Sequence, residues 1–400
     1  MRILLVNDYA TPTAGAERLT LEMRDGLRER GHEVRVFASR AQLIPGDSFA
    51  DASCYGTNTR LQTLTSTVNL SASRALAREI REFAPDVVQV HMFLWQLSPA
   101  ILPVLRRVPS VYYAMTFKPV CPTGLKWLPS GTVCEQRAGI ACVRNRCLTL
   151  AGFGPLMLQR RTWRRRRDAF DTIVCVSSAV QRQLEADGIA TRDVIWPGTK
   201  PASARPPLSG PPTVTFTGRL TPEKGADVLV RAFRSVRDRV PDARLIVAGT
   251  GRDERSLRTL VDRLSLGDAV EMTGQLDAAG IDALIARSWV HAVPSRWPEP
   301  FGLTATEAMM RGTAVVASAL GGLADIVRDG VTGMSVPAGD EAALAGALAQ
   351  VLSDRALAER LGAAARERAL ASFTMDRCIS RFELLYASLL EPERVRARVG

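Results

Sequence analysis

The chain has 400 residues, of which 46% are hydrophobic, and it carries a formal net charge of +11. This length is enough for two globular domains with separate cores. No apolar run reaches membrane-spanning length, and the apolar start passes into polar residues too soon for a signal peptide, so a cytosolic location is expected. The positive charge favours acidic partners: nucleic acid, anionic lipid or phosphorylated small molecules.

The N-terminal half alternates short apolar runs with helix-forming segments. A β-rich run at 2–7 is followed by a loop containing Gly15, a helix at 17–30 and a second strand at 34–38. This order is typical of a doubly wound α/β domain, which binds ligands at the carboxyl ends of its strands. Residues 40–70 are polar and irregular and predict loops. The other elements expected in this half are a helix at 76–83 and strands at 87–90, 110–115 and 172–176.

Two residues of this half are candidates for a site. His91 ends the strand at 87–90, at the edge where catalytic residues of α/β sheets gather, although a lone histidine there is more often structural. Gly15 suits either a simple turn or a phosphate-binding loop, and the loop alone does not decide between them.

Four of the seven cysteines are clustered: Cys121, Cys134, Cys142 and Cys147. In a cytosolic protein a cluster favours metal binding over disulfides, and four thiolates can hold a structural zinc ion. The spacing contains no CxxC pair, however, which a zinc ribbon usually shows. Reduced thiols or a redox-labile pair are the preferred alternative.

The run from Arg160 to Arg167 is the densest charge in the chain and contains Trp163. On a helix it predicts a basic face that an anionic membrane attracts at about 1 kcal/mol per basic residue, with Trp163 at the interface. The alternatives are a solvated helix with acidic neighbours, or a nucleic-acid surface, for which no binding module is recognised. Peripheral membrane contact is the preferred interpretation.

Residues 197–212 are rich in proline, glycine and serine and predict an interdomain linker. A second α/β unit follows, with a strand at 214–217, a loop at 218–225 and a helix at 227–240. His291 lies in an apolar strand and is expected to be a core residue. The other elements expected are strands at 243–248, 269–272, 289–293 and 314–317, and helices at 341–352, 354–370 and 376–390.

Arg219 and Lys224 flank the turn after the first strand of this unit, where an oxyanion would bind. Arginine grips a phosphate with two donors, and lysine adds a point charge. Farther along, two prolines bracket Glu299, and a helix begins near Leu303 and ends at Gly312. The free N–H groups at the start of this helix favour an anion, phosphate above all.

The amides at this helix start belong to Phe301, Gly302 and Leu303. Glu299 precedes them and Glu307 lies on the helix. A carboxylate accepts hydrogen bonds from hydroxyl groups and repels phosphate, so the two glutamates suit sugar or ribose hydroxyls. A capped surface helix with two solvated glutamates is the simpler alternative.

These residues resemble a known family, the retaining glycosyltransferases of family 4. The resemblance rests on EPFGLTATEAMMRG at 299–312, GRLTPEKG at 218–225 and ASALGGLADIVRDGVTG at 317–333. It implies the GT-B fold, an α/β architecture in which two Rossmann-like α/β/α domains face each other across a cleft. The implied division is an acceptor-side domain at 1–196, a linker at 197–212, a nucleotide-sugar-binding domain at 213–375 and a helix at 376–400 that crosses back to the first domain.

The resemblance also implies roles. Arg219 and Lys224 would hold the donor diphosphate, with Gly15 approaching it from the other domain. Glu299, with the amides of Phe301, Gly302 and Leu303, would contact the transferred sugar and the β-phosphate, and Glu307 would bind the ribose. His91 is expected to orient the sugar or the acceptor.

A finer resemblance links PSVYYAMTFKPVCP at 109–122 and CVRNRC at 142–147 to a cysteine-containing branch of the family. That branch commonly has histidine in place of Met115, aspartate in place of Thr116 and cysteine in place of Arg137. The first difference leaves the acceptor-side chemistry open. The last weakens the metal interpretation.

The expected function is retaining, metal-independent transfer of a sugar from a nucleoside-diphosphate donor to a glycan, lipid-linked or small-molecule acceptor. Fixed cations at the leaving diphosphate would make a metal cofactor unnecessary. The alternative is a GT-B protein without transferase activity, such as a sugar-nucleotide epimerase or a degenerate sugar-nucleotide binder. A nucleic-acid binder ranks last, because the site residues would then have no use.

Overall fold

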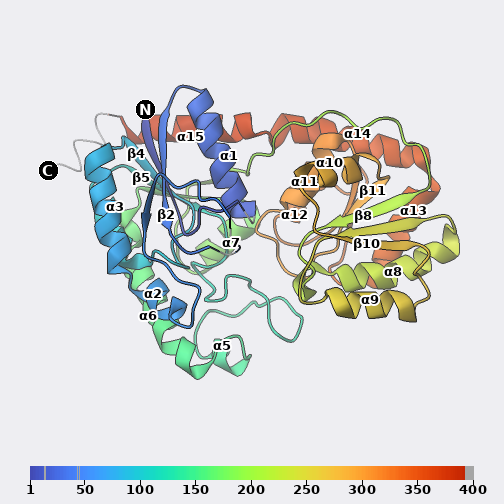
Figure 1. Cartoon of the computed structure of the whole chain (residues 1–400), viewed down its shortest axis with the longest axis horizontal. Coiled ribbons are helices and arrows are strands. Elements are labelled where there is room, and N and C mark those ends of the chain that lie inside the picture. Colours follow the sequence, from blue (N-terminus) through green and yellow to red (C-terminus); the bar gives the residue numbers. More distant parts are fainter. Residues whose placement is uncertain (13–14, 43, 45, 392–400) are drawn as a thin grey trace. The chain divides into compact units, whose positions relative to one another are not determined.

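A computed structural model describes residues 1–12, 15–42, 44 and 46–391 of the chain. The chain forms two compact units (Figure 1). Unit 1 comprises Met1–Pro129, Glu135–Gly198 and the chain from Met375 onward, and unit 2 comprises Ser130–Cys134 and Thr199–Thr374. The last part of the segment expected to cross back, residues 392–400, lies outside the described residues.

Unit 1 is built on a parallel seven-stranded sheet with the order β3-β2-β1-β4-β5-β6-β7. The central strand β1 is an apolar run that is buried from its second residue onward, as expected of a parallel sheet covered on both faces. The strands are β1 (Arg2–Asn7), β2 (Glu33–Ser39), β3 (Ala52–Cys54), β4 (Val87–Val90), β5 (Ser110–Ala114), β6 (Thr172–Cys175) and β7 (Asp193–Val194).

Three helices of unit 1 begin where a side chain caps their free N–H groups. Asn69, Thr149 and Ser177 each accept a hydrogen bond from the amide three residues later, at the starts of α3, α6 and α7. The helices are α1 (Gly15–Glu29), α2 (Gln62–Thr67), α3 (Leu70–Phe83), α4 (Leu102–Leu105), α5 (Ala141–Arg144), α6 (Leu150–Arg166), α7 (Ser178–Ala186) and α15 (Met375–Leu389).

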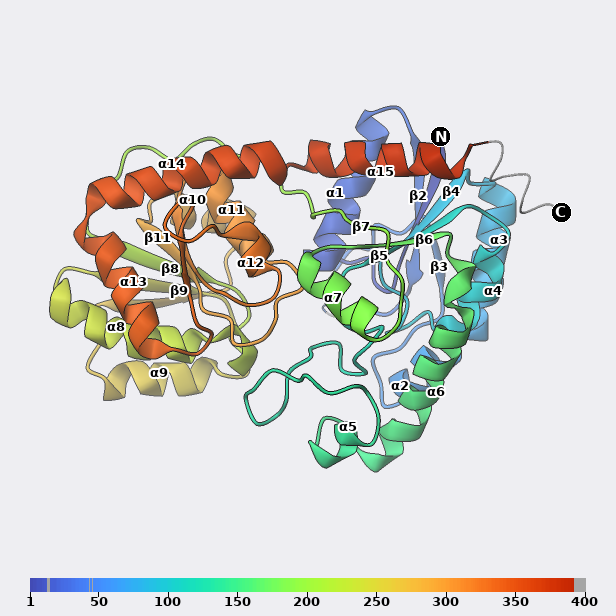
Figure 2. The same cartoon turned by 180° about the vertical axis from the view of Figure 1, so that it is seen from behind.

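The C-terminal helix α15 packs across α1 within unit 1 (Figure 2). Glu383 of α15 accepts a 2.8 Å hydrogen bond from His32 and forms an ion pair with Arg30. The side chain of Ile379 fills the space beside Gly26. This contact joins the two ends of the chain into one unit.

The prediction of loops for residues 40–70 is partly wrong, because β3 and α2 form there. The α2 sequence QTLTST contains three threonines, which have modest helix propensity, and the helix has only six residues. It is stabilised by packing on α6. Local sequence carries little signal for such an element.

Unit 2 has a parallel six-stranded sheet with the order β10-β9-β8-β11-β12-β13. Its strands are β8 (Thr213–Thr217), β9 (Arg244–Ala248), β10 (Val270–Gly274), β11 (Val290–Val293), β12 (Ala314–Ser318) and β13 (Met334–Val336). Its helices are α8 (Ala226–Arg239), α9 (Glu254–Arg263), α10 (Ala278–Ala286), α11 (Leu303–Arg311), α12 (Leu323–Ile326), α13 (Glu341–Ser353) and α14 (Arg355–Ser372). Among the described residues, no helix is both long and apolar enough to cross a membrane.

Each sheet has one point at which the strand order reverses. In unit 1 this point lies between β1 and β4, and in unit 2 it lies between β8 and β11. In open α/β sheets, ligands bind outside the carboxyl ends of the strands at such a point. Arg219 and Lys224 follow β8, and Glu299 follows β11, so the predicted phosphate and sugar residues lie where the topology places a ligand.

Candidate functional site

The loop after β8 carries the two predicted phosphate-binding cations. It contains a single 3₁₀ turn, Pro222–Lys224, that ends at Gly225 with a φ of 72°. A Cβ atom at position 225 would lie 2.0 Å from the carbonyl oxygen of Pro294. Only glycine allows this approach, which places Lys224 against the loop that follows β11.

Lys224 and Glu299 form an ion pair. The lysine Nζ lies 2.6 Å from Glu299 Oε1, and Ser295 Oγ donates to the same oxygen at 2.6 Å. Lys224 Nζ also lies 5.5 Å from the ring centroid of Trp297. Burial alone would raise the pKa of Glu299, but the neighbouring Lys224 charge and hydrogen bonds outweigh it and hold this pKa below its usual value. The carboxyl group is therefore ionised at neutral pH.

Arg219 is held much more loosely than Lys224. Its side chain is 65% exposed, and its Nη2 atom lies 3.8 Å from Glu223 Oε1. An exposed guanidinium with one distant acidic neighbour keeps its hydrogen-bond donors accessible to an anion. The two cations of the loop thus differ in burial. Substitution of the more buried Lys224 should therefore affect stability more than substitution of Arg219.

The loop that carries Glu299 is fixed by the turn after β12. The amide of Gly322 donates to the carbonyl oxygen of Glu299 at 2.7 Å. Gly321 has a φ of 66°, and a Cβ atom there would lie 2.4 Å from the same oxygen. The motif at 317–333 contains this glycine pair, but the sequence alone assigns it no role. The sequence alone also does not reveal Ser295, because a four-residue spacing carries no signal in an irregular, proline-containing loop.

Helix α11 begins at Leu303, with Gly302 at its N-cap and Gly312 at its C-cap, and the predicted C-cap is thereby confirmed. The first N–H groups of a helix have no partner within that helix and carry a partial positive charge. The side chain of Glu307 is half-buried in the second turn. Unit 2 therefore brings together Lys224 and Glu299 shortly before the α11 N-terminus, with Arg219 on the same loop as Lys224. This arrangement suits an anion beside a hydroxyl-bearing group.

His91 in unit 1 is fully buried, and side chains occupy both of its ring nitrogens. Thr20 Oγ1 donates to the Ala16 carbonyl at 2.9 Å and lies 2.7 Å from His91 Nδ1. The Gln89 side-chain amide lies 2.7 Å from His91 Nε2, and its own oxygen accepts from the Tyr386 hydroxyl. These bonds are mutually consistent when His91 is protonated at Nδ1 and accepts at Nε2.

The burial of His91 argues against its expected role of orienting the sugar or the acceptor. No part of the side chain is accessible, and burial lowers its pKa to about 3, so the imidazole is neutral. His91 instead belongs to a buried chain of hydrogen bonds that runs from α15 to the first turn of α1. His291 is likewise fully buried in β11, as expected of a core residue.

The start of α1 and the end of β1 meet at the same edge of the unit 1 sheet. Gly15 is exposed at the first position of α1. Asp8, directly after β1, is fully buried, and its carboxylate accepts hydrogen bonds of 2.8–2.9 Å from the amides of Trp95, Gln96 and Leu97. Burial raises the pKa of Asp8 to about 6. Sequence reasoning did not identify this residue, because its partners lie almost ninety positions away.

The four clustered cysteines were the candidates for a structural zinc site. None of the four forms a disulfide, and all four side chains are partly buried. In the part of the chain that the structure describes, no group of three or more His, Cys, Asp or Glu side chains is arranged to hold a metal ion. The side-chain arrangement thus gives no support to the structural zinc suggested by the cluster.

The arginine run forms the second half of α6, but Trp163 is fully buried rather than at a surface. Its ring packs edge-on against Phe93, Tyr112 and Phe170. The prediction that Trp163 lies at a membrane interface is therefore wrong, because burying the large indole in the core removes more apolar area from water. Arg160 and Arg164 bind Asp187 at 2.6 and 3.1 Å, as the alternative with acidic neighbours predicts.

Two protein families together match residues 13–368 of the chain. Residues 202–368 match the family of glycosyl transferases group 1, and residues 13–202 match Glycosyltransferase Family 4. A phosphatidyl-myo-inositol mannosyltransferase of Mycobacterium leprae is 29% identical, over 92% of this chain and 91% of that enzyme. A glycogen synthase of Mycobacterium tuberculosis is 33% identical, over 57% of this chain and only 56% of that enzyme.

Among solved structures, sucrose-phosphate synthase from Thermosynechococcus elongatus superposes with a TM-score of 0.72 over 97% of this chain and 98% of that one. The two sequences are 22% identical, so this likeness concerns the fold. The predicted fold class is confirmed. The chain belongs to glycosyltransferase family 4 and has the GT-B fold.

Proposed function

We propose that this protein transfers a sugar from a nucleoside-diphosphate donor to an acceptor hydroxyl, with retention of configuration and without a divalent metal. The observation that carries the proposal is the Lys224–Glu299 pair beside the N-terminus of α11, with Arg219 on the same loop as the lysine. The cation and the helix start suit the diphosphate of a sugar-nucleotide donor, and the ionised carboxylate suits the hydroxyl groups of its sugar.

The donor diphosphate would bind to Arg219, Lys224 and the amides at the start of α11. These groups are fixed before the reaction, so they stabilise the charge that grows on the leaving phosphate. One such preorganised donor typically contributes about 3 kcal/mol in the transition state. The protein's own cations thus supply the stabilisation that a metal ion gives in other enzymes.

Glu299 would accept hydrogen bonds from hydroxyl groups of the transferred sugar, and Glu307 from those of the ribose. Lys224 neutralises Glu299 in the structure, and a donor phosphate would share this cation. The pair therefore links sugar recognition to phosphate recognition. The role of Gly15 at the diphosphate stays a prediction.

The reaction would proceed by attack on the same face of the sugar ring. The bond from the anomeric carbon to the phosphate oxygen breaks as the bond to the acceptor oxygen forms. The acceptor proton passes to the departing phosphate, so no separate protein base is needed. The alternative, an epimerase, would need acid–base residues in the N-terminal half, and the fully buried His91 is not accessible for such a role.

We assign acceptor binding to the N-terminal residues 1–196. Glycans, lipid-linked sugars and small molecules remain candidate acceptors, and the mannosyltransferase relative is named for a phosphatidylinositol acceptor. Membership of the cysteine-containing branch and a cytoplasmic location also stay predictions.

The proposal is tested in two steps. A thermal-shift screen across UDP-, GDP- and dTDP-sugars identifies the donor, because a ligand that binds only the native state raises the melting temperature. Release of free nucleoside diphosphate is then measured with and without candidate acceptors, and with EDTA. Acceptor-dependent release that persists in EDTA is expected. Loss of turnover in EDTA would overturn the metal-free mechanism, and failure of every donor to bind would overturn the proposed function.

A further inference from the structure

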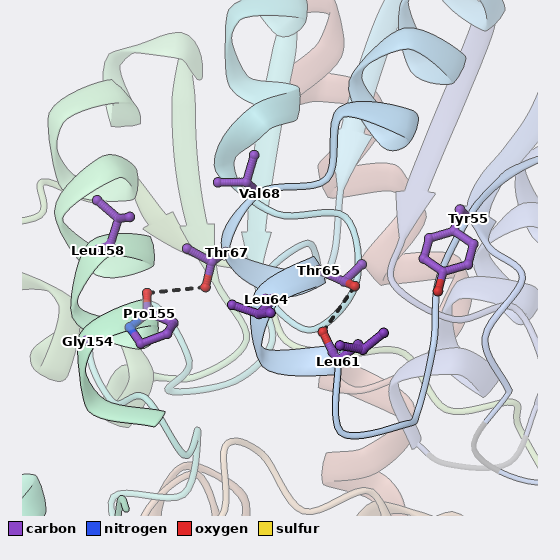
Figure 3. Close-up of a pocket in the computed structure, with 9 residues that line it drawn as sticks. All are labelled: Tyr55, Leu61, Leu64, Thr65, Thr67, Val68, Gly154, Pro155 and Leu158. Atoms are coloured by element: carbon purple, nitrogen blue, oxygen red, sulfur yellow. Dashed lines mark hydrogen bonds between the residues drawn. The ribbon is translucent and has the colours of Figure 1, made fainter. Parts of the chain in front are cut away.

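Unit 1 has an apolar groove between α2 and α6, with a volume of about 590 Å³ (Figure 3). Five of its lining side chains are large, hydrophobic and more than half exposed: Tyr55, Leu61, Leu64, Val68 and Leu158. Pro155 and Gly154 of α6 complete the wall opposite α2, and Thr67 Oγ1 donates to the Pro155 carbonyl at 3.2 Å. Apolar side chains gathered in this way mark an interaction surface.

Three further exposed apolar residues lie close in sequence to the groove residues. Leu70 starts α3 and is 57% exposed, Leu150 starts α6 and is 80% exposed, and Ile140 precedes α5 and is 56% exposed. All three lie in residues 52–78 or 136–167, the two segments that contain the groove-lining residues. Exposed apolar side chains thus occur on several elements of unit 1.

The same two segments carry only positive charge. Residues 52–78 contain three arginines and residues 136–167 contain nine, and neither segment contains an aspartate or a glutamate, although the whole chain has 41 acidic residues. Asp187 lies outside both segments and binds Arg160 and Arg164. Arg161, Arg165 and Arg166 are exposed.

Helix geometry places these arginines beside the groove. Leu158, Arg161 and Arg165 are three and four residues apart along α6 and therefore share one face of the helix. Arg165 follows Leu158 by about 10 Å along the helix axis. On the α2 side, the exposed Arg60 directly precedes Leu61. Basic side chains thus flank the apolar groove on both walls.

We infer that this surface binds an anionic lipid bilayer. The exposed leucines and Val68 insert at the boundary of the acyl chains, and Arg60, Arg161, Arg165 and Arg166 bind the lipid phosphates. Apolar insertion together with basic residues on the same face is the pattern of interfacial membrane binding. Nucleic acid fits less well, because single strands bind on aromatic platforms and the groove has one aromatic residue, Tyr55.

This inference revises the membrane contact expected from the arginine run. The membrane-facing residues are the exposed arginines of α6 together with the α2 leucines, and Trp163 has no part in it. Membrane contact would place the enzyme where lipid-linked acceptors lie. This purpose rests on the proposed function. The binding itself requires no catalytic activity and is measured separately.

The test is co-sedimentation of the full chain with vesicles of phosphatidylcholine alone or mixed with phosphatidylglycerol. We expect binding to the mixed vesicles that weakens with added salt. The triple variant Arg161→Gln, Arg165→Gln, Arg166→Gln should bind them about 100-fold more weakly, because each basic residue near an anionic surface contributes about fivefold. The double variant Leu64→Gln, Leu158→Gln should lose binding even at low salt.

A matched control removes the same charge from exposed arginines of unit 2: Arg239→Gln, Arg255→Gln, Arg263→Gln. It should bind vesicles like the wild type. Equal loss in both triple variants, equal binding to neutral and mixed vesicles, or salt-sensitive binding to DNA alone would overturn the inference. Nucleoside diphosphate release with a soluble acceptor is measured in parallel. If release is intact and vesicle binding is absent, the inference fails and the proposed function stands.

Discussion

Lys224 Nζ lies 2.6 Å from Glu299 Oε1, which joins the loop after β8 to the loop after β11 in a single, mostly buried ion pair. The lysine side chain is 21% exposed and the glutamate side chain 8%. Removing one partner of such a pair leaves a charge that is neither solvated nor compensated. A residue proposed to bind phosphate therefore also contributes to the stability of unit 2.

Lys224→Ala should lower both nucleoside diphosphate release and thermal stability. The double variant Lys224→Ala, Glu299→Gln should recover much of the stability, because the unpaired carboxylate is gone, while turnover stays low. Thermal unfolding and initial rates measure the two effects. An unchanged melting temperature in Lys224→Ala would contradict the structural part of this prediction.

Arg219→Ala should lower turnover by about 100-fold or more, the usual effect of removing one fixed donor to a developing anion. Its melting temperature should match the wild type, because the side chain is 65% exposed. The exposed Arg255→Ala is the control for a lost surface charge. Wild-type rates in Arg219→Ala would exclude the diphosphate role.

Asp8 should make unit 1 less stable as the pH rises between about 4 and 6. Its folded pKa is raised to about 6 from 3.8, so the unfolded chain loses this proton first. The contribution of Asp8 is then greatest below pH 3.8, falls by up to about 3 kcal/mol as the pH rises and is constant above pH 6.

Urea unfolding of the wild type and of Asp8→Asn across this pH range checks the sign. The asparagine does not titrate, so the difference between the two proteins should shrink as the pH rises. A constant difference would mean that Asp8 titrates equally in both states.

His91 should be neutral, carry its proton on Nδ1 and show no titration near its ordinary pKa of 6.5, since its folded pKa is about 3. A lowered histidine pKa means that stability falls as the pH drops below 6.5, because the unfolded chain takes up the proton. Nitrogen NMR of the imidazole reports both the tautomer and the titration. A proton on Nε2 would contradict the bonding to Thr20 and Gln89.

Thr20→Val removes the hydroxyl that accepts the His91 proton and should cost about 1–3 kcal/mol, the usual cost of a buried donor left without a partner. Thr20→Ser keeps the hydroxyl and serves as the control. Equal stability of the valine and serine variants would show that the bond contributes nothing.

Local sequence patterns predict the strand–loop–helix order of both units and the main elements of the proposed phosphate site. Apolar runs such as 2–7 and 87–90 mark buried parallel strands, and the structure gives these strands the same bounds. The site loop was predictable because its signals are local. Prolines around Glu299 exclude regular structure, and helix-forming residues from Leu303 to Gly312 define a helix start.

Which polar side chains meet depends on the completed fold. Lys224 and Glu299 are 75 positions apart, and His91 and Thr20 are 71 apart, so no local pattern reveals either contact. Trp163 illustrates the same limit: the arginines around it predicted a surface position, but packing against distant aromatic residues buried it. Local sequence sets backbone preferences, whereas burial and partner choice depend on what the completed fold places against each side chain.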